Sequence, residues 1–412
     1  MSTPSAGPVG LEDIQRARAA SGGVVRRTPM LYSTVLSDLA GGEVWLKCEN
    51  LQRAGSFKIR GAYWRMSRLT PSERARGVVA ASAGNHAQGV ALAASILDVP
   101  ATVVMPEAAP LPKLAATRGY GAQVVLHGAT IADALARAGQ IAEQTGAIFI
   151  HPFDHPDVVA GQGTVGLEIA EQCPQARTVI VPVGGGGLAA GVAIALRDAA
   201  AQEVGEGPVV LGVQAGAVAP FPASLAAGHP VAVRPDPTMA DGIAVDRPGQ
   251  LTFRLVSELV RDVLTVTEDG LARALLVCLE RAKLLVEPAG AAGVAALLEH
   301  RDQIRPPVVA LLSGGNIDPL LLARVLRHGL AAAGRFLAMR CRIPDLPGSL
   351  AGLLTAVADL GGNLIEVAHE RVSAGLRVAE VEVILQLETR GPEHREAIIE
   401  ALAERGYAAA VL

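Results

Sequence analysis

Lys58 is the first residue of this sequence whose type and setting could support covalent chemistry. It lies in the segment GSFKIRGA, residues 55–62, and only four of the 36 basic residues of the chain are lysines. Because the other cations are arginines, a lysine is expected where an amine must lose its proton and condense with a carbonyl group. The alternative is that Lys58 only caps a surface turn and that the arginine bias reflects nucleotide composition.

A run of four glycines at residues 184–187 is the second candidate. It follows an apolar run and precedes a helical stretch, and bare backbone amides at the start of a helix can hold a phosphate group. The pattern Gly184-x-Gly186-x-x-Ala189 also matches a dinucleotide fingerprint, which leaves a nicotinamide-dependent oxidoreductase open. A dinucleotide site would place an acidic residue after the next strand, where this chain has Gln214, so a single phosphate monoester is the better ligand.

Short apolar runs of strand type alternate with alanine-rich helical stretches before residue 330. The predicted strands are residues 77–80, 101–105, 123–126, 148–150, 179–183, 209–213 and 308–312. This alternation predicts an α/β fold with parallel sheets. Three runs end in glycine or small polar residues, at 82–84, 184–187 and 313–315, and open α/β sheets bind ligands at this end of their strands. These three loops are therefore expected to form the site.

A second, smaller unit is predicted after residue 334. The helical stretch before it is expected to end near Arg327, and residues 331–334 form an Ala-Ala-Ala-Gly hinge. The predicted order beyond the hinge is strand 336–343, helix 347–360, strand 363–371, strand 377–387, helix 392–405 and strand 407–412. This βαββαβ order is ferredoxin-like.

The composition argues against several classes of function. The chain has 36 basic and 40 acidic residues and only 3% aromatic ones, so no nucleic-acid partner is expected. The four cysteines are far apart and none is spaced like a zinc site, which predicts a reduced, cytoplasmic protein without a bound metal. No apolar stretch reaches membrane-spanning length and the N-terminal residues lack a targeting signal, so no membrane association is expected.

A lysine poised to form an imine, a phosphate cradle and loops at strand ends together favour pyridoxal phosphate as the cofactor. The segments GSFKIRGA, SAGNHAQGVA, VPVGGGGLAAG, EPAGAAG and LLSGGN occur in the order and spacing of the fold-type II pyridoxal-phosphate enzymes, which have the tryptophan synthase β-like fold. The set most resembles threonine dehydratase (threonine ammonia-lyase), over essentially the whole chain. The resemblance implies a catalytic domain at residues 1–330 with two open parallel-sheet subdomains, the smaller at about 54–152.

The resemblance also implies roles for individual residues. Lys58 would hold the cofactor through an imine, and Phe57 would pack against the pyridine ring. Asn85 would donate a hydrogen bond to the ring 3-oxygen, and Ser313 would face the ring nitrogen. The residues expected to hold the phosphate are Gly184, Gly185, Gly186, Gly187 and Leu188. Those expected to bind the substrate carboxylate are Ser82, Ala83, Gly84, Asn85 and His86.

Some of these residues also have simpler structural interpretations. The resemblance places Glu287 and Gly290 near the ring, but Glu287 could be an ordinary carboxylate at the start of a helix. His86 could form a hydrogen bond inside its own loop. The roles of Asn85 and Ser313 depend almost wholly on the resemblance.

The residue type at position 313 bears on the reaction. A serine hydroxyl can only share a hydrogen bond with the ring nitrogen, whereas an aspartate would keep that nitrogen protonated and make the ring a stronger electron sink. The weaker sink favours elimination over transamination. The resemblance implies that L-threonine loses its α-proton to Lys58 and then its β-hydroxyl, giving 2-oxobutanoate and ammonia, and that L-serine gives pyruvate. The expected role is the first step of isoleucine biosynthesis.

The C-terminal unit resembles the ACT domain, an amino-acid-sensing module. The resemblance rests on residues 343–350 (IPDLPGSL) and 362–365 (GNLI), and it implies that Gly348 and Asn363 bind an effector. Isoleucine is the expected effector, and valine could oppose it. The alternative is that this unit only joins subunits. With one such unit per chain, a homodimer or homotetramer is expected.

Two rival functions stay open. Serine racemases have the same fold, but their family carries a serine as second base on the face opposite the lysine, where this chain has Ala83. Gln214 and Ala215 also stand where that family has residues of the type that ligate a divalent cation. A non-catalytic amino-acid sensor would keep the scaffold and use only the C-terminal unit. The intact Lys58, Asn85 and Ser313 argue against a sensor.

Overall fold

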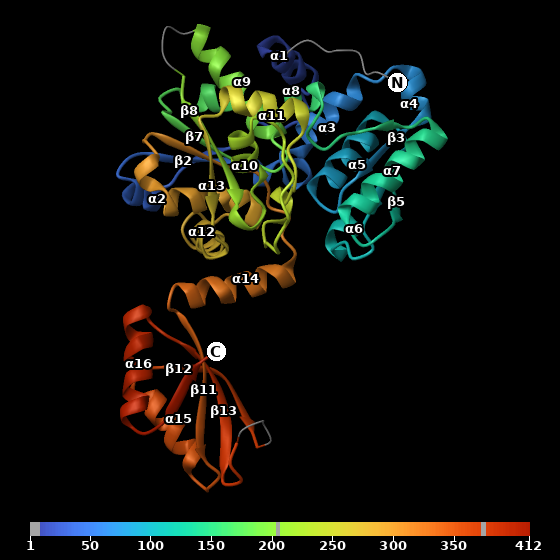
Figure 1. The fold of residues 1–412 in the computed structure, drawn as a ribbon. Coiled ribbons are helices and arrows are strands. Elements are labelled where there is room, and N and C mark those ends of the chain that lie inside the picture. The colour runs from blue at the N-terminus through green and yellow to red at the C-terminus, as the bar shows by residue number, and fades with distance from the viewer. Residues whose placement is uncertain (1–8, 203–206, 372–375) are drawn as a thin grey trace. The chain divides into compact units, whose positions relative to one another are not determined.

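All seven apolar runs predicted as strands before residue 330 are strands, and they belong to two separate sheets (Figure 1). The chain divides into two units, Met1–Pro319 and Leu320–Leu412, and both of these sheets lie in the first unit. The computed structural model describes residues 9–202, 207–371 and 376–412. The predicted alternation is therefore confirmed as an α/β fold with parallel sheets.

The larger sheet has six strands in the order β1-β2-β10-β7-β8-β9. They are β1 (Met30–Tyr32), β2 (Val44–Cys48), β7 (Thr178–Pro182), β8 (Val209–Ala215), β9 (Asp262–Val266) and β10 (Val308–Leu312). β1 is antiparallel to β2, and the other pairs are parallel. The sequence does not predict β1, β2 and β9. β1 has only three residues, and β2 and β9 carry charged or polar residues that interrupt the apolar run.

The smaller sheet has four parallel strands in the order β5-β4-β3-β6. They are β3 (Val78–Ala81), β4 (Ala101–Met105), β5 (Gln123–Leu126) and β6 (Ile148–Phe149). Parallel neighbours need crossover connections. Helices α5 (Asn85–Leu97), α6 (Leu111–Gly119) and α7 (Ile131–Thr145) supply them. The sheet falls inside residues 54–152, the range that the resemblance assigns to the smaller subdomain.

Helices α8 (Pro156–Gln172) and α9 (Gly187–Gln202) pack closely against each other in the core of the larger sheet. Small residues make this possible: a Cβ on Gly191 would lie 2.6 Å from the backbone nitrogen of Gly163. The other helices of this unit are α1 (Leu11–Ala20), α2 (Thr34–Ala40), α3 (Lys58–Ser67), α4 (Pro71–Arg76), α10 (Pro220–Ala227), α11 (Gln250–Leu259), α12 (Glu268–Glu280) and α13 (Pro288–Glu299). Short 3₁₀ helices are η1 (Glu49–Leu51), η2 (Arg53–Gly55), η3 (Gly216–Val218), η4 (Asp241–Ile243) and η5 (Arg301–Gln303).

The second unit includes α14 (Pro319–Ala332), which the sequence assigns to the first. The expected end of this helix near Arg327 is wrong, because the helix continues through the first two residues of the predicted hinge. Leucine and alanine at residues 330–332 favour helix, so nothing in this stretch stops it. The turn comes at Gly334, whose φ of +66° favours glycine.

The rest of the second unit has the predicted βαββαβ order. Its elements are β11 (Phe336–Pro344), α15 (Ser349–Asp359), β12 (Asn363–Glu370), β13 (Glu380–Glu388), α16 (Pro392–Glu404) and β14 (Ala408–Val411). The strands form an antiparallel sheet in the order β12-β13-β11-β14. Alternate residues of β11 and β13 pack with buried residues of α15 and α16, so both helices cover the same face of the sheet.

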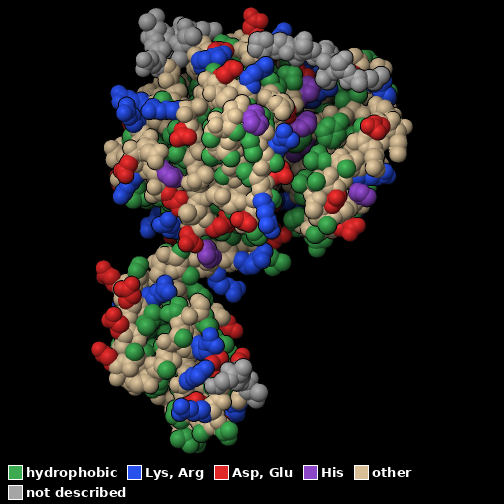
Figure 2. All heavy atoms as spheres, viewed as in Figure 1, with side chains coloured by type: hydrophobic (Ala, Val, Ile, Leu, Met, Phe, Trp, Pro, Cys, Tyr) green, Lys and Arg blue, Asp and Glu red, His purple; other side chains and the backbone are tan. Residues whose placement is uncertain are grey.

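The surface carries charges of both signs. Figure 2 shows acidic and basic side chains interspersed over the visible face, as the formal net charge of −4 would suggest. Within the described residues, no helix combines the length and apolar character needed to cross a membrane.

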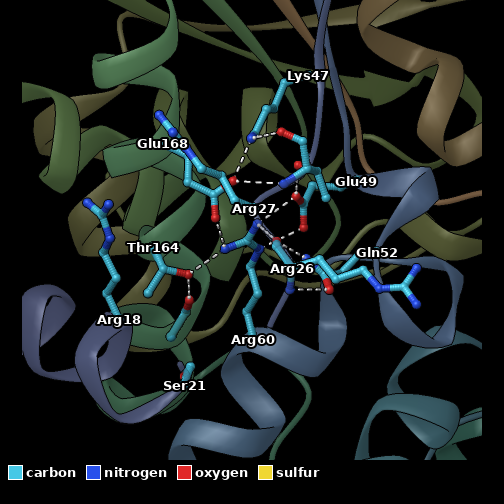
Figure 3. A network of polar contacts seen from close by, with 12 residues as sticks. Arg18, Ser21, Arg26, Arg27, Lys47, Glu49, Gln52, Arg60, Thr164 and Glu168 are labelled. Atoms are coloured by element: carbon cyan, nitrogen blue, oxygen red, sulfur yellow. Dashed lines mark hydrogen bonds and ion pairs between the residues drawn. The ribbon is translucent and has the colours of Figure 1, made fainter. Parts of the chain in front are cut away.

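A network of buried charges ties α3 to η1 and α8 (Figure 3). Arg60 donates to both carboxylate oxygens of Glu49 at 2.7 Å and to Glu168 at 2.7 Å. Lys47, from β2, donates to the other oxygen of Glu168 at 2.5 Å. These four side chains are at most 7% exposed. Burial alone would raise the pKa of Glu168, but the charges of Arg60 and Lys47 lower it below its usual value.

Arg60→Met is expected to lower the free energy of unfolding by about 3–5 kcal/mol, because it leaves two carboxylates buried without their main partner. The matched control is Arg18→Met. Arg18 pairs with Glu171 at the surface, where an ion pair contributes about 0–1 kcal/mol. Chemical denaturation followed by circular dichroism measures both changes, and equal losses in the two variants would contradict a structural role for the network.

Candidate active site

Lys58 lies where the carboxyl ends of the two parallel sheets meet. It is the first residue of α3, and its Nζ donates to the carbonyl oxygen of Pro152, in the loop after β6, at 3.2 Å. The ring centroid of Phe57 is 5.2 Å from the same Nζ. The N–H of Phe57 donates to the carbonyl of Ser313, directly after β10, at 3.1 Å. The lysine is thus held between loops from both sheets, at the edge where α/β folds bind ligands.

The amine of Lys58 is unusually easy to deprotonate. Its pKa is lowered to about 8, mainly because burial removes water from the ammonium ion, while the negative charge of Glu287 opposes the shift. A pKa of about 8 leaves a useful fraction of neutral amine near pH 7, which imine formation requires.

His86 is a neutral neighbour of this amine. Burial, and then the charge of Lys58, lower its pKa to about 3. Its Nε2 lies 2.9 Å from the carbonyl oxygen of Ile150 and donates to it. Ile150 directly follows β6, outside the loop that leads into His86. The hydrogen bond therefore connects the segment after β3 to the segment after β6.

The glycine loop joins β7 to the N-terminus of α9. Within the described residues, the N–H groups of Gly185 and Gly186 have no hydrogen-bond acceptor. Leu188, in the first turn of α9, is 5% exposed and belongs to the core. Free amides and the positive end of a 16-residue helix together favour an anion at this loop.

Packing against Phe153 explains why the loop consists of glycines. A Cβ on Gly185 would lie 2.3 Å from the Phe153 ring, and one on Gly187 would lie 2.9 Å from the Phe153 carbonyl oxygen. Gly186 has a φ of +96°, which favours glycine. The carbonyl of Gly185 also accepts a hydrogen bond from Thr252 at 2.6 Å. The loop is therefore fixed between two neighbours and leaves its amides free.

The loop after β3 brings the expected carboxylate-binding residues to the start of α5. The loop comprises Ser82, Ala83 and Gly84, and α5 begins with Asn85 and His86. The Oγ of Ser82 accepts from the N–H of Gly84 at 3.0 Å, which shapes the turn. The N-terminus of this 13-residue helix favours a negative group, as binding of a carboxylate would require.

Asn85 connects this loop to the larger sheet. Its Nδ2 donates to Oε1 of Glu287 at 2.5 Å, and its Oδ1 accepts from Nδ2 of Asn316 at 2.9 Å. Both partners come from segments near the end of β10 or the start of α13. The two hydrogen bonds fix which end of the Asn85 amide faces Glu287.

Glu287 has an oxygen that its own chain does not satisfy. It is 2% exposed and precedes α13, but its side chain makes no capping hydrogen bond, so the simple helix-start interpretation is not supported. In the described part of the chain, its Oε2 is buried without a hydrogen-bond partner. Burial raises its pKa to about 7, against the positive charge of Lys113. A buried oxygen of this kind indicates a polar ligand group.

Gly290 and Ser313 are the remaining residues expected at the site. Ser313 begins the loop after β10, and Gly290 packs against that loop. A Cβ on Gly290 would lie 2.4 Å from the carbonyl oxygen of Gly314, so this position needs glycine for α13 to approach the loop after β10. Ser313 is 3% exposed. The site residues expected from the sequence in the first unit are thus gathered at the carboxyl ends of β3, β7 and β10 and at the starts of α3, α5 and α13.

Sequence reasoning misses several residues of the site. Pro152 and Phe153 follow β6, so the strand-end rule that finds the other three loops could have found this one too. Asn316 is the last residue of the segment LLSGGN, residues 311–316, and the resemblance gives it no separate role. Lys113 and Asp241 follow no motif and no predicted strand, yet their side chains form an ion pair beside Glu287.

Residues 23–314 match the family model described as "Pyridoxal-phosphate dependent enzyme". The chain belongs to this family. An L-threonine ammonia-lyase of Thermotoga maritima is 48% identical over 397 residues, covering 96% of this chain and 98% of the relative. The chain is therefore a pyridoxal-phosphate dependent lyase related to the L-threonine ammonia-lyases.

Two solved structures match most of the chain, and the residues matched by the family model lie within the first unit. A threonine deaminase from T.th. is 42% identical with a TM-score of 0.70, over 75% of this chain and 99% of its own. A maize serine racemase is 35% identical with a TM-score of 0.72, over 78% of this chain and 98% of its own. The expected fold-type II architecture is confirmed for this unit.

The residues of the site fit pyridoxal phosphate, the cofactor of this family. The free amides of Gly185 and Gly186 can receive the phosphate group, and Lys58 supplies an amine of lowered pKa within the same edge of the fold. The unpartnered Oε2 of Glu287 marks a place where a ligand atom completes the polar contacts.

Gln214, the residue that bears on the racemase comparison, has a structural role. Its Nε2 donates to the carbonyl of Val183 at 3.2 Å, and its Oε1 accepts from the N–H of Phe221 at 2.9 Å. It is 0% exposed and fastens the end of β8 to the end of β7 and to α10. Across the described ranges, no group of three or more His, Cys, Asp or Glu side chains is placed to hold a metal ion.

The rate at which the apoenzyme forms its imine with added pyridoxal phosphate is expected to rise with pH through about 8. Only the neutral amine of Lys58 attacks the aldehyde, and its fraction reaches one half at the pKa. Absorbance at a series of pH values gives the midpoint. Glu287→Gln removes a charge that raises this pKa, so its midpoint should lie lower. A midpoint near the ordinary lysine value of 10.5 would contradict the assignment.

Proposed function

We propose that this enzyme converts L-threonine to 2-oxobutanoate and ammonia by removal of the α-proton and loss of the β-hydroxyl, and L-serine to pyruvate as a side activity. The observation that carries the proposal is the amine of Lys58, partly buried and with a pKa lowered to about 8, which donates to Pro152, the residue before the Phe153 that packs against the glycine loop. Support also comes from the relative in Thermotoga maritima and the solved threonine deaminase, which are named for threonine.

Bound pyridoxal phosphate supplies an electron-withdrawing ring that lowers the energy of the carbanion formed at Cα. The chain supplies the other groups. The neutral amine of Lys58 would take the α-proton, and the charge of Glu287 would stabilise the resulting ammonium ion. The loop at residues 82–86 holds the substrate carboxylate at the start of α5. Asn85, fixed by Glu287 and Asn316, would donate to the ring 3-oxygen of the bound cofactor.

The residues around the ring favour elimination over the competing reactions. Ser313 would offer a hydroxyl to the ring nitrogen of the bound cofactor, and the ring would then be a weaker electron sink than it would be beside an aspartate. Racemisation needs a second acid/base group across from Lys58, and Ala83 has no titratable side chain to serve as one. Loss of the β-hydroxyl is therefore the favoured outcome after the α-proton is removed.

Turnover of L-threonine to 2-oxobutanoate is expected from the purified protein with pyridoxal phosphate, and Lys58→Ala should lower kcat by about 10³-fold or more because the proton acceptor is lost. Lys283→Ala is the matched control, since this lysine lies at the surface and its Nζ donates to the Glu280 carbonyl. A coupled assay for the 2-oxo acid measures both variants. Formation of D-serine from L-serine without any 2-oxo acid would replace the proposal with the racemase hypothesis.

We propose that the C-terminal unit is an ACT domain that binds isoleucine, with valine opposing it. The ferredoxin-like order supports this, as do the positions of the two residues named for effector binding. Gly348 directly precedes α15 with a φ of +90°, and open space surrounds its Cβ position. Asn363 opens β12, and its Nδ2 donates to Glu388 at 3.1 Å. This would leave exposed backbone beside α15 for the carboxylate and amine of an amino acid.

Isoleucine is expected to bind the full-length enzyme and to weaken threonine turnover, as an end product of the pathway would. Asn363→Ala should weaken isoleucine binding by about fivefold or more while leaving kcat without effector unchanged. Calorimetric titration measures the affinity. Coupling between two binding sites is reciprocal, so the factor by which isoleucine weakens threonine binding is also the factor by which threonine weakens isoleucine binding. Isoleucine binding that is unaffected both by threonine and by the Asn363 substitution would overturn the assignment.

The wider setting is proposed on the same basis. We infer a cytoplasmic homodimer or homotetramer with a role at the start of isoleucine biosynthesis. The spread of four buried cysteines and the relationship to L-threonine ammonia-lyases support this inference.

A further inference from the structure

An ion pair joins the two sheet subdomains of the first unit at the edge of the site. Lys113, in α6 of the smaller subdomain, places its Nζ 2.5 Å from Oδ2 of Asp241, in η4 beside the larger sheet. The lysine side chain is 7% exposed and the aspartate side chain is 50% exposed. A lysine this deeply buried with one charged partner indicates a fixed geometry, because a flexible surface lysine would stay hydrated.

The lysine end of the pair faces the loop expected to bind the substrate carboxylate. The Nζ of Lys113 lies 3.8 Å from the position that a Cβ on Gly84 would take. Its backbone is held in α6, where the Lys113 carbonyl accepts a hydrogen bond from Thr117 at 2.8 Å. The ammonium ion is therefore presented to the substrate side of the smaller subdomain from a rigid helix.

The aspartate end belongs to a turn that touches two other parts of the site. A Cβ on Gly184, in the phosphate-binding loop, would lie 3.3 Å from Cα of Ile243. A Cβ on Gly242 would lie 3.6 Å from Oε1 of Glu287. The turn η4 is thus packed between the glycine loop and Glu287, and its first residue, Asp241, holds Lys113.

We propose that Lys113 and Asp241 are positioning residues that clamp the substrate loop of the smaller subdomain against η4, so that the site closes around the amino acid. The proposal rests on the proposed elimination of L-threonine. The clamp ties the smaller subdomain, which carries both Lys58 and the loop at residues 82–86, to the turn η4, which packs against the glycine loop and Glu287. Neither residue donates or accepts a proton in the reaction.

The clamp predicts a loss of substrate affinity more than of chemistry. In Lys113→Met and in Asp241→Asn, KM for L-threonine is expected to rise about fivefold while kcat changes less, because the loop loses one ionic anchor but Lys58 is untouched. The double variant Lys113→Asp with Asp241→Lys exchanges the charges and should restore part of the lost affinity. Lys283→Met, at an exposed lysine, is the matched control and should behave as the parent.

A second measurement does not depend on turnover. Quenching of the fluorescence of the bound cofactor by acrylamide, in the holoenzyme without substrate, reports how open the site is. Both single variants are expected to quench more strongly than the parent, and the charge-exchanged double variant is expected to return towards it. Asp241→Asn keeps the measurement informative if Lys113→Met folds poorly, because Asp241 is half-exposed.

Three results would overturn the clamp. One is unchanged KM and unchanged quenching in both single variants. Another is a fall in kcat at constant KM, which would place the pair in the chemistry. The third is a double variant no better than either single one, which would show that the two charges act separately. If the parent itself fails to convert L-threonine, the proposed function is lost, and quenching alone then decides whether the pair closes the site.

Discussion

An ammonium ion loses hydration as protein atoms surround it, and Lys58 is partly buried where the carboxyl ends of the two sheets converge. The lowered pKa of this one amine depends on every element that shields it. The loop after β6 supplies the carbonyl of Pro152, Phe57 supplies an apolar ring, and Glu287 limits the shift by its charge. A looser junction between the sheets would hydrate the amine, and it would then stay protonated at neutral pH.

The helix that carries Lys58 is fixed by charges that take no part in the chemistry. Two residues further along α3, Arg60 is fully paired with Glu49 and Glu168. These carboxylates belong to η1 and α8, so the start of α3 is tied to the larger sheet and its helical layer. The charged network therefore fixes the position of the reactive amine, and the surrounding loops set its pKa.

Local patterns in the sequence predict most of the scaffold and part of the site. Seven strands, the ferredoxin-like order and the glycine loop follow from apolar runs and motifs, because each depends on neighbouring residues. β2 escapes prediction since Lys47 is neutralised by Glu168, which lies 121 residues away. Lys113 and Asp241 escape for the same reason, being 128 residues apart. Pairs of this kind are created by tertiary structure, and no local pattern marks either partner.

The four-charge network around Arg60 also constrains how this sequence can diverge. Replacing any one member leaves an uncompensated ion in an apolar interior, while an apolar quartet of similar volume could pack there without penalty. The intermediate steps between these two solutions are each unfavourable. Lys47, Glu49, Arg60 and Glu168 therefore form an epistatic set, and descendants of this chain should keep all four or exchange them together. Because single replacements are unfavourable, related sequences should keep the position of α3 even where their surface residues differ.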